Sequence, residues 1–169
     1  MKNIKSLLVV LIVIFAFSFA VSAQTVNLTS LDGEKIDVQG QKGKVVILAI
    51  GASWLPLSNQ QAIFTNKLAK KFAGRDVMIY FVATDSTSAK SKNYASDEEV
   101  RRFAVTNKIS VPVLRDSDGA ITLKKFGIDQ LPSFVILGKD GKPAAEPYGG
   151  IDPKSDITIS IAQQVDKLL

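Results

Sequence analysis

The sequence of 169 residues contains no cysteine, no histidine and only one tryptophan. Without cysteine the chain has neither a disulfide nor a thiolate nucleophile. Without cysteine and histidine it also lacks the common ligands of zinc and other transition metals. The missing histidine excludes a Ser–His catalytic pair as well. We therefore expect a protein with no bound metal and no cofactor, whose fold depends on its hydrophobic core.

Charged residues are present in ordinary proportion, at 22% of the chain, with a formal net charge of +5. The basic residues are spread along the sequence, and the short pairs Lys70-Lys71, Arg101-Arg102 and Lys124-Lys125 are typical of solvated helix faces. No basic stripe with interleaved aromatic residues occurs, so we expect no nucleic-acid partner. The length and the 46% hydrophobic content predict one globular domain.

The first 23 residues have the pattern of a secretory signal peptide. Lys2 and Lys5 give a basic start, residues 7–19 are an apolar run broken only by Ser18, and small residues precede Ala23. The pattern predicts cleavage after Ala23, a mature domain over residues 24–169, and an exported protein that is periplasmic or secreted. The alternative is an uncleaved N-terminal anchor, which would be the only contact with a membrane.

The rest of the chain is organised around residues 44–58. Residues 45–50 are apolar and rich in β-branched side chains, which indicates a strand buried on both faces. After a turn through residues 51–56, residues 60–72 predict a helix with Phe64, Leu68 and Phe72 on one face. Residues 77–84 are a second apolar strand, so the three elements predict a parallel βαβ unit.

Further elements follow from turn and capping signals. A hairpin is predicted over residues 25–28 and 35–38, across Asp32-Gly33, and a helix over residues 97–106 after the cap Ser96. Residues 134–137 and 143–146 predict a second hairpin. The pair Asp152-Pro153 predicts the start of a final helix that runs to the C-terminus.

Two motifs carry a resemblance to a known family. Ala52-Ser53-Trp54, after a Lys-Val-Val strand, resembles the Ala-x-Trp-Cys-x-x-Cys segment of thioredoxin-like redoxins of the TlpA/ResA type, which are related to AhpC/TSA proteins. Leu131-Pro132-Ser133 before an apolar strand is similar to the segment that carries the cis-proline of that family. The resemblance implies an α/β thioredoxin-like fold, with a central mixed sheet flanked by helices and an N-terminal β-hairpin extension. It also implies a cis Leu131–Pro132 bond that faces the first motif.

The reactive atoms of such a redoxin are missing. Leu55 and Ser58 stand at the two cysteine positions, with Pro56 and Leu57 between them. Disulfide exchange needs a thiolate, whereas leucine has no heteroatom and a serine hydroxyl is far too weak an acid to replace it. The family often has polar or acidic residues where this chain has Ala49 and Gln61, which we interpret as packing or helix-surface positions. We therefore predict no catalytic residue.

The surface that binds partners could remain although the reactive cysteines are absent. Our first hypothesis is a non-catalytic module that binds a protein or an extended peptide by strand addition. The loop from Asp85 to Ala95 either forms part of the same binding surface or is simply exposed to solvent. The residues predicted to bind the partner are Trp54, Pro56, Leu57, Leu131, Pro132 and Ser133.

Three other interpretations remain open. Trp54 could pack over the core while Leu55 fills the space of a cysteine, in which case the surface has no partner. The chain could instead be a redoxin-family oxidoreductase or transferase that uses Ser58 at a helix N-terminus to stabilise an anion. A degenerate paralogue with a structural role in an envelope complex is the third. Whether the chain is an enzyme is thus undecided, and the non-catalytic interpretation is favoured.

Overall fold

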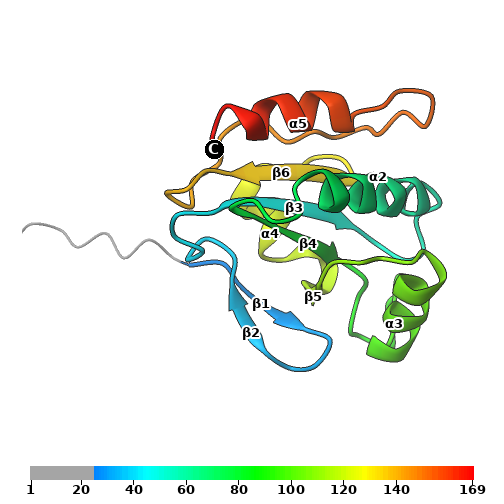
Figure 1. Ribbon diagram of the computed structural model, residues 1–169. Coiled ribbons are helices and arrows are strands. Elements are labelled where there is room, and N and C mark those ends of the chain that lie inside the picture. The colour runs from blue at the N-terminus through cyan, green and yellow to red at the C-terminus, as the bar shows by residue number, and fades with distance from the viewer. Residues whose placement is uncertain (1–24) are drawn as a thin grey trace, which may run out of the picture.

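The structure, a computed structural model, describes residues 25–169 (Figure 1), so the predicted signal peptide over residues 1–23 lies outside the described residues. These residues form a six-stranded mixed sheet in the order β2-β1-β5-β4-β3-β6. The elements in chain order are β1 (Asn27–Ser30), β2 (Lys35–Asp37), β3 (Val45–Gly51), α2 (Leu57–Lys71), β4 (Val77–Ala83), α3 (Asp97–Thr106), β5 (Val113–Arg115), the 3-10 turn η1 (Ser117–Gly119), α4 (Thr122–Phe126), β6 (Ser133–Leu137) and α5 (Thr158–Asp166).

The predicted βαβ unit is confirmed and supplies the centre of the sheet. All seven residues of β3 are buried, and β3 pairs in parallel with β4 and antiparallel with β6. Helix α2 connects β3 to β4 and begins at Leu57, three residues before the predicted start. The continuous apolar run of β3 therefore reflects a strand that is covered on both faces.

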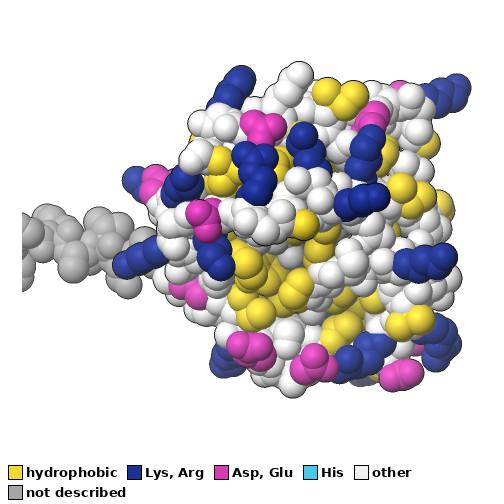
Figure 2. All heavy atoms as spheres, in the orientation of Figure 1, with side chains coloured by type: hydrophobic (Ala, Val, Ile, Leu, Met, Phe, Trp, Pro, Cys, Tyr) yellow, Lys and Arg dark blue, Asp and Glu magenta, His cyan; other side chains and the backbone are white. Residues whose placement is uncertain are grey.

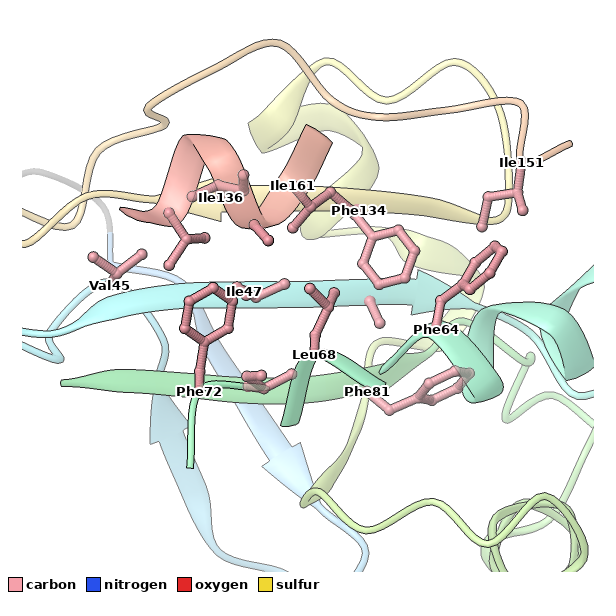
Figure 3. Packing of buried hydrophobic residues seen from close by; sticks show 14 of the residues in the cluster. Val45, Ile47, Phe64, Leu68, Phe72, Phe81, Phe134, Ile136, Ile151 and Ile161 are labelled. Carbon is pink, nitrogen blue, oxygen red and sulfur yellow. The ribbon is translucent and has the colours of Figure 1, made fainter. Parts of the chain in front are cut away.

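Helices cover the two faces of the sheet unequally. Figure 1 shows α2 and α5 on one side of β3 and β6, with α4 on the other side. Alternate residues of β3 serve the two cores: Val45, Ile47 and Ala49 pack with α2, α3 and α5, whereas the intervening residues pack with α4. The first core is shown in Figure 3, where Phe64 and Leu68 of α2 point toward β3.

The predicted N-terminal hairpin is confirmed, shifted by two residues in its first strand. Asn27 pairs with Asp37 and Thr29 with Lys35. Strand β1 also pairs antiparallel with β5, through Thr29 and Arg115. The hairpin is consequently part of the central sheet and lengthens it at one edge.

The predicted strand over residues 143–146 is wrong. The turn after β6 forms as expected, because Gly138 N–H donates to Lys142 O at 2.8 Å, and a single bridge joins Leu137 to Pro143. Ala144 N–H also donates to Ile136 O at 2.9 Å, and the next bridge to β6 joins Tyr148 to Phe134. Leu137 and Phe134 are three positions apart in β6, whereas Pro143 and Tyr148 are five positions apart, so the returning chain bulges away and no continuous ladder forms.

The predicted start of the last helix is also wrong, since α5 begins at Thr158. The Asp152 carboxylate accepts a hydrogen bond from Lys154 N–H at 2.9 Å, within a turn that precedes the helix. Asp156 takes the role expected of Asp152, because its carboxylate accepts from the N–H of Thr158 at 3.1 Å.

The face shown in Figure 2 carries Lys and Arg side chains scattered among acidic ones, with hydrophobic side chains exposed between them. Within residues 25–169, none of the helices has the length and apolar character that crossing a membrane requires.

Candidate functional site

The sheet brings the two sequence motifs together at one edge. Ile50, near the end of β3, pairs with Ser133 at the start of β6. The segments 52–58 and 131–133 therefore leave adjacent strands at the same end. The Leu131–Pro132 peptide bond is cis, as the resemblance implied.

A buried amide links the two segments. The Gln61 side chain is fully buried, and its Nε2 donates to Ser133 O at 2.8 Å and to Ile50 O at 3.2 Å. Its Oε1 and the Ser133 Oγ are buried and accept or donate no hydrogen bond within residues 25–169. The interpretation of Gln61 as a possible helix-surface residue is wrong: it lies three residues before Phe64, on the inward face of α2.

The former cysteine positions differ in burial. Leu55 is half-buried, whereas Ser58 is fully buried in the first turn of α2. The Ser58 Oγ accepts a hydrogen bond from Ala52 N–H at 3.2 Å. A Cβ at Gly51 would lie only 2.8 Å from this Oγ, so the close approach of helix and strand requires glycine there. The serine hydroxyl thus holds the turn between β3 and α2.

Asp85 is a site residue that the sequence analysis assigned only to the start of a loop. It follows β4, is fully buried, and accepts from Ser53 N–H at 3.0 Å and from Ser53 Oγ at 2.5 Å. The signal was its position, since a polar residue directly after a buried parallel strand lies at the edge where sites form. Its carboxylate fixes the segment that carries Trp54.

The remaining predicted partner-binding residues are placed as follows. Trp54 is 49% exposed and Leu57 is 37% exposed, and Pro56, between them in the sequence, is also exposed. Leu131 is half-buried, and Pro132 and Ser133 are buried. The exposed part of the site is therefore apolar, whereas Pro132 and Ser133 are buried.

The backbone of Leu131 is unpaired. Neither its N–H nor its C=O makes a hydrogen bond to any residue within 25–169. Backbone groups of the following segment are paired, for example Phe134 N–H with Tyr148 O at 3.0 Å. One free donor and one free acceptor thus remain in the segment just before β6.

Two neighbouring features border this surface. A cleft of about 310 Å³ lies between the start of α2 and α3, with Ser53, Asn59, Arg102 and Phe103 in its wall. The loop from Asp85 to Ala95 is closed at its base, where Ala95 N–H donates to Ser86 O at 3.1 Å. Whether this loop takes part in binding stays a prediction. No cluster of three acidic side chains that could hold a metal ion occurs among the described residues.

Comparison with known proteins agrees with the motifs. The AhpC/TSA family pattern matches residues 20–144. The thiol-disulfide oxidoreductase ResA of Bacillus thuringiensis subsp. konkukian is 29% identical over 121 residues, which cover 72% of this chain and 64% of the relative. The thioredoxin-like protein YneN of Bacillus subtilis is 32% identical over 115 residues, covering 68% of this chain and 62% of that protein. The chain thus spans less than two thirds of the length of these relatives.

Solved structures show the same fold. A putative thiol:disulfide interchange protein DsbE from Chlorobium tepidum superposes with a TM-score of 0.70 at 19% identity, covering 86% of this chain and 94% of its own. The exposed lipoprotein thioredoxin Etrx1 of Streptococcus pneumoniae has a TM-score of 0.67 at 25% identity, covering 85% of this chain and 99% of its own. The chain therefore belongs to the AhpC/TSA family, as a thioredoxin-like redoxin of the ResA type whose motif cysteine positions are Leu55 and Ser58.

Proposed function

We propose that this redoxin is an exported, non-catalytic module that binds an extended segment of a partner protein. The observation that carries the proposal is the free backbone of Leu131, in a segment that adjoins β6 where β6 pairs with the end of β3, the strand before the exposed Trp54. A peptide in extended conformation would pair with the N–H and C=O of Leu131 and place apolar side chains against Trp54, Pro56 and Leu57. Pro132 and Ser133 would shape the groove from beneath.

The chemistry of the former cysteine positions supports binding in preference to catalysis. Leu55 offers no nucleophile, and the Ser58 hydroxyl is buried and bonded to Ala52 N–H. A hydroxyl with no exposed surface cannot meet a substrate, which weighs against the alternative of an oxidoreductase or transferase that uses Ser58. The neutral Gln61 also supplies no proton acceptor beside it.

Export is part of the proposal. Its support is the basic and apolar pattern of residues 1–23, together with the similarity to Etrx1, which is described as an exposed lipoprotein. The chain has no disulfide that would indicate an oxidising compartment. The proposal of export therefore depends mainly on the N-terminal pattern. N-terminal sequencing of protein recovered from its host tests this part, and the expected first residue is Gln24.

Trp54 provides the test of binding because it is the only tryptophan in the chain. We expect the purified protein to select extended peptides with apolar side chains from a random peptide library. Binding of these peptides should shift the fluorescence emission of Trp54 to the blue, because the indole side chain leaves water. The double variant Trp54→Ala with Leu131→Arg should select no peptide above background.

The matched control changes two exposed apolar residues away from the groove. Val105 in α3 is 77% exposed and Ile159 in α5 is 58% exposed. The double variant Val105→Arg with Ile159→Ala should keep the selected peptides and their affinity. Equal peptide recovery by the wild type and the Trp54/Leu131 variant would refute the groove. Turnover by the wild type in insulin-reduction or glutathione-conjugation assays would refute the absence of catalysis.

A further inference from the structure

Strand β2 forms one edge of the sheet. Within residues 25–169 its single neighbour in the strand order is β1, whereas β6, at the opposite edge, receives bridges from Pro143 and Tyr148. Figure 1 shows β2 at the outer end of the sheet, with no helix of the described chain over its free side. An uncovered edge strand offers its backbone groups to another extended segment. The free side of β2 is therefore a candidate contact surface.

The hydrogen-bond pattern shows which backbone groups of β2 face outward. Val38 N–H, just after β2, donates to Val26 O at 3.0 Å. Because bonded pairs alternate along an antiparallel ladder, the backbone groups of Lys35 and Asp37 point away from β1. In the part of the chain that the structure describes, the one hydrogen bond to these groups is from Gln41 Nε2 to Asp37 O, at 3.0 Å. A carbonyl oxygen can accept two hydrogen bonds, so the N–H and C=O of both residues remain available.

The side chains of β2 alternate between charged and apolar. Ile36 is half-buried against the core on the α4 side, so Lys35 and Asp37 lie on the other face of the sheet. Their partners on β1 are the uncharged residues Thr29 and Asn27. Among the described residues Lys35 forms no ion pair, and the Asp37 carboxylate accepts only backbone N–H groups, through Oδ1. Both charges of β2 are thus without an opposite charge in one copy of the chain.

Charged residues on an edge strand usually prevent pairing between copies of a protein. In β2 the two charges are opposite in sign and flank one apolar residue, so a symmetric antiparallel contact centred on Ile36 places Lys35 of each copy opposite Asp37 of the other. The same register lets the outward N–H and C=O groups of these residues bond to each other, and it brings the two Ile36 side chains together. Registers centred on Lys35 or on Asp37 would instead place like charges opposite each other.

We propose that two copies of this chain associate through β2 in the register centred on Ile36, which joins their sheets across a twofold axis. The contact is short and its charges lie near the surface. We therefore expect weak association that increases with protein concentration and decreases with salt. The contact uses a different edge of the sheet from the groove at Trp54, so this proposal and the proposed function can fail separately.

Sedimentation velocity of the purified protein tests the association. We expect the average mass to rise from that of a monomer toward that of a dimer as the protein concentration approaches about 1 mM, and to fall when sodium chloride is added. Lys35→Glu should raise the dissociation constant about tenfold, because it places like charges opposite each other at both ends of the contact. Lys70→Glu is the matched control, since Lys70 is an exposed residue of α2 that forms no ion pair among the described residues, and it should leave the dissociation constant unchanged.

The absence of cysteine allows the register to be tested by crosslinking. Ile36→Cys would bring two thiols together in a non-hydrogen-bonded antiparallel pair, where a Cα–Cα distance of about 4.5 Å permits a disulfide. Mild oxidation should link this variant into a dimer, whereas Val105→Cys, at a position of α3 that is 77% exposed, should stay monomeric. A wild type that remains monomeric up to about 1 mM overturns the proposal. Equal crosslinking of the two cysteine variants, or association that Lys35→Glu does not weaken, also overturns it.

Discussion

Replacing Gln61 by alanine tests whether one buried amide holds the two segments of the groove together. The change removes the hydrogen bonds from Nε2 to Ile50 O and Ser133 O, each contributing about 1 kcal/mol net. Truncation of a buried side chain adds roughly 1 to 2 kcal/mol for the space left behind. Removing the unpartnered Oε1 returns about 1 kcal/mol of desolvation.

The sum predicts that Gln61→Ala lowers the free energy of unfolding by about 2 to 3 kcal/mol, as measured by urea unfolding. For a domain of this size the thermal midpoint should fall by roughly 4 to 12 °C. The neighbouring Gln60 provides the matched control, because it is half-buried and makes no side-chain hydrogen bond within residues 25–169. Gln60→Ala should change stability by less than about 0.5 kcal/mol. Equal effects of the two substitutions would refute the role given to Gln61.

Two further predictions concern carboxylates. Asp85→Ala should destabilise the fold by roughly 2 kcal/mol through loss of the bonds from Ser53, and should lower the fluorescence anisotropy of Trp54 as its segment becomes mobile; unchanged anisotropy would count against this anchor. Hydrogen bonds from Ser96 hold the pKa of Glu99 below its ordinary 4.5, so its contribution to stability is complete above that pH and is lost as pH falls through the folded pKa. Glu99→Gln should therefore be less stable than the wild type at neutral pH and should approach it below pH 4.5, as followed by urea unfolding across the range.

The sequence predicted the elements whose signals are local and redundant. The strand at residues 45–50 combines apolar composition with β-branching, and the segment at Pro132 repeats a family motif, so both are in place. The predicted strand over residues 143–146 does not form because the returning chain has two extra residues between its bridges to β6, a bulge that the turn signal before it does not reveal. The predicted start of the final helix is wrong because Asp152 and Asp156 are both residues that can cap a helix. The turn at Asp152 delays the helix until after Asp156, and the sequence pattern did not show this turn.

The sequence predicted which motif residues meet at the edge of the sheet, but not the residues that support them. Trp54 and Leu57 are exposed, as a binding surface requires, and their part in binding stays a prediction. Gln61 and Asp85 support the same surface through bonds that connect residues 72 and 32 positions apart in the chain, which no local pattern reveals. Their polar side chains suggested solvent, whereas each is buried because its donors or acceptors are met across the fold.

The central claim is that the redoxin frame persists without the atoms that exchange disulfides. Insulin reduction in the presence of dithiothreitol, measured side by side for the wild type and the Leu55→Cys, Ser58→Cys double variant, tests it most directly. We predict no rate above background for the wild type and a measurable rate for the double variant, because the segment, the α2 N-terminus and the cis Leu131–Pro132 bond are already in place. Disulfide reduction by the wild type, or a folded double variant that stays inert, would contradict the account.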